Sequence, residues 1–294
     1  MGPIAYQNKA LIYGLLLRSA AETLISTAAD RKYLGAKIGL TAFLHTWGEN
    51  LQHHPHVHCM VPAGGISPDG RHWIACRPGS FLPVRVLSRL FRRLFLAGLT
   101  AAYDAGELQF FSDVAALNEA KNFAAALERL RTTDWDVYAK KASADPKQVL
   151  CYFSRYTHRV AITNTRLVDL DETHVSFRCK DYRESGGHKS KVVRLEIAEF
   201  IRRFLLHVLP DGFQRIRHYG LFANGHRADK LALCRSFLDA PSLPTDRDNR
   251  DDKDAGAPKH EAPPCPCCGG RMKIIETFDG PGCRPYHVRR LDGL

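Results

Sequence analysis

The sequence predicts a fold that mixes helices with an antiparallel hairpin. Two apolar, strand-prone segments, 38–47 and 56–61, are separated by an eight-residue connection that begins at Gly48, a residue that favours a turn. Longer apolar segments without internal proline predict helices on both sides of this hairpin. Hydrophobic residues make up 45% of the 294 residues and charged residues 25%, so we expect a globular domain with a sizeable core.

The segments around the hairpin predict the remaining elements of the N-terminal half. Residues 5–29 are rich in Ala and Leu and predict a long first helix. Residues 83–106 have a proline near their start and a glycine at their end, as helices often do, and 114–131 predict another helix. The segment 134–141, "DWDVYAKK", predicts a strand.

The C-terminal half begins with a short helix, because Asp145 and Pro146 supply a cap and a first-turn proline before "KQVLCYFSRYTHR". Two further helices are predicted, the first of which is stopped by Pro210 and the second of which ends at residue 238. The predicted strands are 160–167, 174–179 and 192–197, and the predicted helices are 198–210 and 227–238.

The composition changes after these elements. Residues 240–264 contain no aromatic residue and are rich in Asp, Pro and Ala, so they cannot bury enough apolar surface to fold and are predicted to be a disordered linker. Residues 265–294 form a cysteine-containing basic tail. Its Cys-x2-Cys and Gly-Gly pattern predicts a zinc knuckle, although Cys267 leaves the ligands open and an unstructured reduced tail is the alternative. The predicted structural Zn²⁺ ligands are Cys265, Cys268, Cys283 and His287.

The formal net charge of +11 favours a polyanionic partner, either nucleic acid or an anionic membrane surface. The chain has no apolar run of about 18 residues, so no membrane span is predicted. The nine cysteines are irregularly spaced and indicate a reducing cytoplasm rather than a disulfide framework. Four arginines fall on and around one face of the 83–106 helix, a pattern typical of a solvated surface: Arg85, Arg89, Arg92 and Arg93.

Histidines crowd the second strand of the hairpin, in "HHPHVHCMV". Side chains two apart in a strand share a face about 7 Å apart, so His56 and His58 can converge on one metal ion. The third ligand is open: His45 can lie opposite the pair across the hairpin, and His54 is the local alternative, although Pro55 is expected to bend the chain there. Imidazole ligands suit Zn²⁺, whereas two histidines with open positions also suit Mn²⁺ or Mg²⁺ with water and phosphate oxygens. A histidine cluster without a role is the alternative interpretation.

A tyrosine pair lies nearly a hundred residues later. Tyr152 and Tyr156 are four apart, hence on one face of the predicted helix, with Gln148 one turn earlier and Arg155 and Arg159 beside them. Aromatic residues at this spacing often only pack in a core. Tyrosine is also a covalent nucleophile, and a metal with nearby guanidinium groups can activate a phosphodiester for its attack. Together with the histidines, the pair favours phosphoryl transfer from DNA to tyrosine.

These motifs resemble the two-tyrosine HUH (His-hydrophobic-His) transposases of rolling-circle insertion sequences, the IS ninety-one type. The HUH motif is His56-Val57-His58, and the tyrosines are Tyr152 and Tyr156. The resemblance runs from the first helix to the tail in about the family's order and spacing. It is carried by "FLHTWGENLQHHPHVHCMVPAGG", "YFSRYTHRVAITNTRL", "EFIRRFLLHVLPDGFQRIRHYGLFAN" and "CPCCGGRM".

The resemblance implies an α+β fold, an HUH (Rep/relaxase-like) antiparallel sheet with flanking helices, over residues 1–239. It implies His56 and His58 as ligands of a divalent metal, Mg²⁺ or Mn²⁺, and Tyr152 and Tyr156 as nucleophiles. The third ligand does not carry over cleanly; we prefer His45, with Gln148 as the alternative. Arg155 and Arg159 become candidate DNA contacts.

The implied reaction cuts one DNA strand without ATP and leaves a 5′-phosphotyrosine and a free 3′-OH. The second tyrosine permits a second strand transfer. The implied partner is single-stranded DNA at the ends of the insertion sequence and at the target, in the bacterial cytoplasm at the nucleoid. Members of the family usually begin with a cysteine-rich zinc segment and a first strand, and we expect this chain to be truncated after both.

Three other functions remain open on the sequence. A replication initiator or relaxase-type nickase would use the same site, and a truncated DNA-binding remnant would keep the surface without the activity. A zinc hydrolase of small molecules would use the histidines and leave the tyrosines in the core, but it leaves the charge of +11 unexplained.

Overall fold

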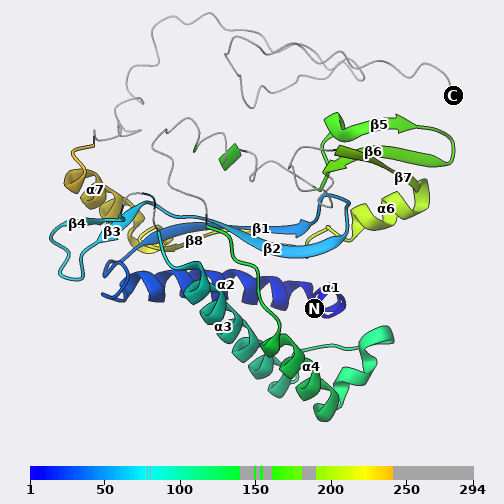
Figure 1. The fold of residues 1–294 in the computed structure, drawn as a ribbon, viewed down its shortest axis with the longest axis horizontal. Coiled ribbons are helices and arrows are strands. Elements are labelled where there is room, and N and C mark those ends of the chain that lie inside the picture. Colours follow the sequence, from blue (N-terminus) through cyan, green and yellow to red (C-terminus); the bar gives the residue numbers. More distant parts are fainter. Residues whose placement is uncertain are drawn as a thin grey trace, which may run out of the picture. The chain divides into compact units, whose positions relative to one another are not determined.

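The structure is a computed structural model that describes residues 1–77, 79, 81–139, 149, 153–154, 161–180 and 190–240. All described elements belong to the unit Met1–Ser242. The predicted linker, the predicted zinc knuckle and most of the predicted tyrosine helix lie outside the described residues. The fold mixes α-helices with antiparallel sheets (Figure 1), as the sequence predicted.

The chain begins with two helices, α1 (Gly2–Gln7) and α2 (Lys9–Ala29), where the sequence predicted one. The break lies at Asn8, whose backbone leaves the helical region. The Asn8 side chain donates to the carbonyl oxygens of Ile4 (3.0 Å) and Gln109 (2.9 Å) and accepts from the Gln109 amide (2.8 Å). A tertiary contact about a hundred residues away therefore interrupts a segment whose local propensity is helical throughout.

The central sheet has three antiparallel strands in the order β2-β1-β8. β1 (Gly39–Trp47) and β2 (His53–Met60) form the predicted hairpin, but its connection is shorter than predicted because β2 begins at His53. The Gly48 amide donates to the Gln52 carbonyl oxygen (3.0 Å) and closes the turn. β8 (Ile216–Gly220) was not predicted, because its five residues are too short and too polar for a clear strand pattern.

The hairpin contains a β-bulge. His45 pairs with His56, but Trp47 pairs with His53, so His54 and Pro55 together lie opposite the single residue Thr46. Proline has no amide hydrogen to give to the ladder and is found at such irregular positions. The bulge agrees with the expectation that Pro55 bends the strand.

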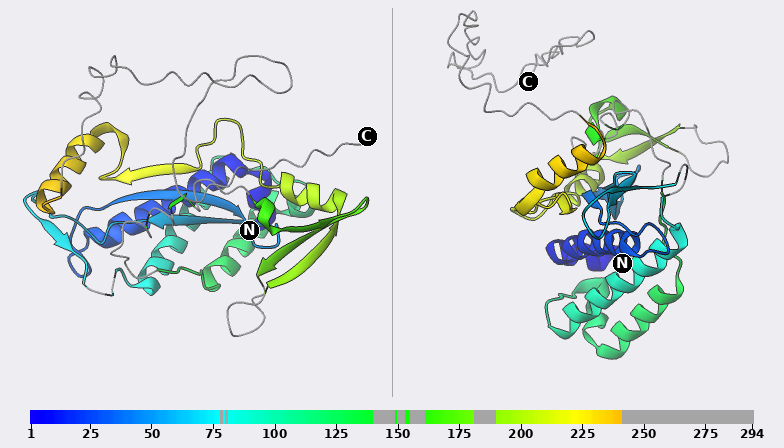
Figure 2. Two further views of the ribbon diagram at one scale, coloured as in Figure 1. Left: turned by 90° about the horizontal axis from the view of Figure 1, so that it is seen from above. Right: turned by 90° about the vertical axis from the view of Figure 1, so that its left-hand side faces the viewer.

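One face of the central sheet is covered by α2. Leu40, Ala42 and Leu44 of β1 and Val57 and Cys59 of β2 belong to one hydrophobic core with the apolar side of α2. The helix α3 (Val84–Asp104), which the sequence predicted, packs on the other side of α2, away from the sheet (Figures 1 and 2). The opposite face of the sheet is therefore free of α2 and α3.

The predicted helix 114–131 is two elements, the 3-10 helix η1 (Ser112–Asn118) and α4 (Ala120–Thr132). The predicted strand 134–141 is wrong over 134–139, where the chain has no regular structure. The Trp135 ring packs against Phe91 and Phe95 of α3, and its indole N–H donates to the Leu130 carbonyl oxygen at 3.2 Å. This segment thus covers α3 as an irregular strap instead of entering a sheet.

A second antiparallel sheet follows, in the order β5-β6-β7. β6 (His174–Lys180) and β7 (Ser190–Glu196) agree with the predicted strands. The predicted strand 160–167 is wrong over 161–166, which contain the 3-10 turn η2 (Asn164–Arg166), and β5 is Leu167–Leu170. α6 (Ile197–Leu205) packs Phe200 against Phe177 of β6 and ends before the predicted proline stop.

The remaining described elements are short. β3 (Gly64–Ile66) and β4 (Trp73–Ala75) form a two-stranded ribbon that the sequence did not predict, η3 is Asn224–His226, and α7 (Arg227–Phe237) agrees with the last predicted helix. Within the described part of the chain, no helix is both long enough and apolar enough to cross a lipid bilayer. Cys59, Cys76 and Cys234 are free thiols.

Candidate metal centre

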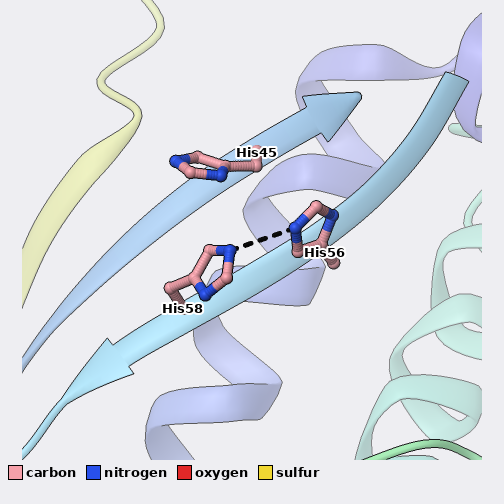
Figure 3. A group of neighbouring side chains, drawn as sticks. All are labelled: His45, His56 and His58. Carbon is pink, nitrogen blue, oxygen red and sulfur yellow. Dashed lines mark hydrogen bonds between the residues drawn. The ribbon is translucent and has the colours of Figure 1, made fainter. Parts of the chain in front are cut away.

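Three histidines converge on the face of the central sheet that α2 leaves uncovered (Figure 3). His45 comes from β1 and is only 5% exposed, and His56 and His58 come from β2 and are partly buried. One ring nitrogen of each lies within 4.8 Å of the other two. The three could therefore hold one metal ion.

The strand register explains this convergence. His45 lies directly opposite His56 in the antiparallel pair, and His58 is two positions farther along β2, so all three side chains emerge on one face. The ring centroids of His45 lie 5.5 Å from His56 and 4.6 Å from His58, and those of His56 and His58 lie 4.8 Å apart. Two residues of one strand and one of its neighbour thus form a triangle.

The bulge sets the orientation of His56. Its Nδ1 lies 2.8 Å from the carbonyl oxygen of His54, which can only accept, so Nδ1 carries the hydrogen and Nε2 presents a lone pair. A metal-binding histidine usually donates a hydrogen bond from its second ring nitrogen to a group such as a backbone carbonyl, which fixes the orientation of the ring. His54 therefore acts through its backbone, and its exposed side chain is not part of the group of three.

The nitrogen spacing fits a shared ion. Nε2 of His56 lies 3.1 Å from Nε2 of His58. Two imidazole nitrogens bound to one ion at about 2.0–2.1 Å are roughly 3 Å apart. Three imidazoles suit a divalent transition metal such as Zn²⁺. Mg²⁺ or Mn²⁺ could use the same three nitrogens if water or phosphate oxygens completed its coordination shell.

His45 is held by an aromatic neighbour. The ring of Trp47, two positions along β1, stacks on it with a centroid distance of 4.4 Å and an interplanar angle of 18°. Such stacking restricts rotation of the imidazole about its side-chain bonds. Trp47 thus keeps the His45 ring beside His56 and His58.

Burial keeps His56 and His58 neutral. It lowers the pKa of His58 to about 3, with a further contribution from the neighbouring His45 and His56, and it lowers the pKa of His56. Neutral imidazole is the form that binds metals, so at neutral pH both rings are ready to coordinate without losing a proton.

Phe153, which lies between the two predicted tyrosines in the sequence, contacts the same face. Phe153 is helical, and its ring packs edge-on against Phe43 of β1 with a centroid distance of 5.3 Å. Phe43 is two positions from His45 and lies opposite His58, so it shares the face of the histidines. Tyr152 and Tyr156 themselves lie outside the described residues, as do Gln148, Arg155 and Arg159.

A second group of polar side chains supports the hairpin end. The Tyr13 hydroxyl and Nε2 of His53 are 2.7 Å apart, and His207 lies 3.2 Å from both the Thr46 hydroxyl and the Leu51 carbonyl oxygen. Sequence reasoning gave these residues no role; the only signal was that each lies inside or beside an apolar segment. Together they tie α2 and the segment after α6 to the bulged hairpin.

Comparisons with known proteins point to one family. A family model described as "Putative transposase" matches residues 39–230, which contain the central sheet and all three histidines. The chain is 57% identical over 285 residues to "Putative transposase y4qJ" of Sinorhizobium fredii, covering 94% of this chain and 70% of that protein. It is 25% identical over 236 residues to "Transposase for insertion sequence element IS801" of Pseudomonas savastanoi pv. phaseolicola, covering 76% of this chain and 51% of that protein. No solved structure matches the chain.

Proposed function

Because the chain belongs to the "Putative transposase" family, we propose that it cuts and rejoins single DNA strands by tyrosine attack at the histidine centre, as a rolling-circle transposase of the two-tyrosine HUH type. Its substrate is DNA, presented as a single strand at the ends of the mobile element and at the target. The observation that carries the proposal is the triangle of His45, His56 and His58 on a sheet face that Phe153 also contacts.

The three histidines form the proposed ligand set for Mg²⁺ or Mn²⁺, with His45 as the third ligand. A divalent ion held there would polarise a non-bridging oxygen of the scissile phosphate and make the phosphorus more electrophilic. Imidazole ligands carry no negative charge, so a phosphate can approach the centre without repulsion from them.

The tyrosines are the proposed nucleophiles. Phe153 follows Tyr152 in the sequence and packs against Phe43, which supports a placement of the tyrosine helix over the histidine face. The hydroxyl oxygen of Tyr152 or Tyr156 attacks the phosphorus, and the bond between the phosphorus and the 3′ oxygen breaks. The tyrosine proton ends on the departing 3′ oxygen. One phosphodiester replaces another, so the step needs no ATP and can run backwards to rejoin strands.

A second tyrosine one turn away allows two covalent strand ends to exist at once, which strand exchange between donor and target requires. Arg155 and Arg159 are proposed to contact the phosphate groups beside the cut, because guanidinium groups bind phosphate through two parallel hydrogen bonds. The net charge of +11 supports a polyanionic substrate.

The test is covalent capture of DNA. The protein is incubated with single-stranded oligonucleotides from the element ends and Mn²⁺, and the products are separated on a denaturing gel. A slowly migrating protein–DNA adduct is expected, and it should disappear in the Tyr152→Phe, Tyr156→Phe double variant. Tyr138→Phe is the matched control, because Tyr138 is 85% exposed and lies outside the site. Cleavage that yields two free DNA ends and no adduct would rule the mechanism out.

A further inference from the structure

Helix α3 carries a stripe of exposed arginines. Arg85, Arg89 and Arg93 follow one another at intervals of four residues, so each lies about 6 Å farther along the helix on nearly the same side. Ala97 and Ala101 continue the stripe and are also exposed. The result is a basic surface about 12 Å long that turns by about 40° around the helix at each arginine, followed by a stretch with very short side chains. We call these three arginines the α3 stripe.

The α3 stripe has no acidic partner within the described residues, where no ion pair involves Arg85, Arg89 or Arg93. Like charges four apart on a helix repel one another. Three other exposed arginines have acidic partners, since Arg131 contacts Glu128 at 3.2 Å, Arg194 contacts Asp171 at 2.8 Å and Arg202 contacts Glu199 at 2.6 Å. The stripe is therefore a concentration of positive charge that the described part of the molecule leaves unneutralised.

The fourth arginine of this helix does not belong to the stripe. Arg92 points toward the strap that follows α4 and donates to the Thr133 carbonyl oxygen at 2.7 Å. It thus fastens the strap to α3. Arg92 therefore supports the fold, whereas the three arginines of the stripe are exposed.

The stripe is remote from the histidine centre. α3 packs on α2, and α2 covers the face of the central sheet opposite to His45, His56 and His58 (Figures 1 and 2). A DNA segment bound to α3 is consequently a different segment from the one bound at the metal centre.

We propose that the α3 stripe binds the phosphate backbone of double-stranded DNA. This inference rests on the proposed function for the identity of the polyanion as DNA. Three guanidinium groups on a rigid helix suit regularly spaced phosphates, and the short side chain of Ala97, one turn after Arg93, lets this end of the helix approach the duplex closely. No exposed residue of α3 is aromatic, so unpaired bases would find no ring there on which to stack. This favours a duplex over a single strand. The stripe would thus hold the duplex that flanks the strand being cut.

The test measures the binding of a 20-base-pair duplex by fluorescence anisotropy over a range of salt concentrations. The Arg85→Gln, Arg89→Gln, Arg93→Gln variant should bind at least about tenfold more weakly at low salt, and the slope of log K against log salt should fall by about 2.7, or 0.9 for each lost phosphate contact. The Lys variant at the same three positions should keep most of the slope, because it keeps the charge.

The matched control removes three paired arginines, as Arg131→Gln, Arg194→Gln and Arg202→Gln, and should change the slope by less than one. An equal loss in control and stripe variants, or an unchanged slope in the stripe variant, would overturn the proposal. Stripe-dependent binding of anionic lipid vesicles without duplex binding would overturn it as well.

The outcome is separable from the proposed function. Adduct formation on a short single-stranded oligonucleotide depends on the histidine centre and should be unchanged in the stripe variant. Loss of duplex binding with intact adduct formation supports the stripe, and failure of the wild-type chain to form any adduct would count against the proposed function alone.

Discussion

The two faces of the central sheet are built from alternate residues of the same strands, and along β1 both are buried but differ in chemistry. On the α2 side, Leu40, Ala42 and Leu44 of β1 are at most 1% exposed and pack in the main core. On the other side, Thr41, Phe43 and His45 alternate with them. A period of two thus places core leucines and the candidate metal ligand His45 on a single nine-residue strand.

The difference shows why the register matters. A slip by one residue would turn the histidines toward α2 and the leucines toward the opposite face, so the imidazoles would enter the apolar core. The bulge at His54 and Pro55 lies just beyond the three histidines and ends this strict alternation. It also aims the His54 carbonyl at His56, so the same irregularity that ends the regular ladder orients a proposed ligand.

The largest expected effect is on the histidine face. His58→Ala should slow formation of the covalent DNA adduct by about a thousandfold, because the ion that stabilises the reacting phosphate loses a ligand. The melting temperature should barely change, since His58 is not in the main core. His54→Ala is the neighbouring control and should retain most activity. Equal losses in the two variants would mean that the three-histidine centre has no special role.

The next effect is on the core face. Leu44→Ala should lower the free energy of unfolding by about 2–5 kcal/mol, because it leaves a cavity where a side chain 1% exposed was packed. Urea unfolding followed by circular dichroism measures this change. Leu170→Ala, at a position 70% exposed, should stay within about 0.5 kcal/mol of the original chain. A core variant as stable as the surface variant would contradict the assignment of the two faces.

A smaller effect is expected where an aromatic ring supports the centre. Trp47→Ala should weaken Mn²⁺ binding about 10- to 100-fold, since the stacked ring that positions His45 is lost. Trp47→Phe keeps an aromatic ring and should restore most of the affinity. Calorimetric titration of both variants is the measurement, and an affinity that is unchanged in the alanine variant would show that His45 needs no such support.

The smallest effect tests where the centre ends. His218 of β8 shares the face of the histidines, and its Nδ1 lies 3.0 Å from the Thr41 hydroxyl, but it is not part of the group of three. His218→Ala should cost about 1 kcal/mol of stability from the lost hydrogen bond and leave Mn²⁺ affinity unchanged. A tenfold weaker affinity would instead extend the centre to β8.

Sequence reasoning reached the parts of this face that follow from local periodicity. The hairpin, the shared face of His56 and His58 and the position of His45 across from them all follow from alternation along two short strands. The elements that it missed depend on distant contacts. Asn8 breaks the first helix through Gln109, and Trp135 turns an apparent strand into a strap by packing on α3.

The same limit applies to the support of the candidate site. β8 completes the central sheet from about 170 residues away, and its short polar sequence carries no strand signal of its own. Pro55 indicated that the strand is irregular at the register shift that orients His56. Which histidine this irregularity leaves out of the group of three depends on the pairing with β1. The tyrosine helix and the cysteine-containing tail stay predictions, because they lie outside the described residues.

The most direct test of the central claim is the ligand set of bound Mn²⁺. Pulsed electron paramagnetic resonance of the Mn²⁺-loaded chain, with ¹⁵N-labelled histidine, counts the coordinating imidazole nitrogens. We expect one ion per chain at this centre with three histidine nitrogens, and two in the His45→Ala variant. Mn²⁺ that shows no histidine coupling, or a coupling unchanged by both His45→Ala and His58→Ala, would contradict the assignment of this sheet face as a metal centre.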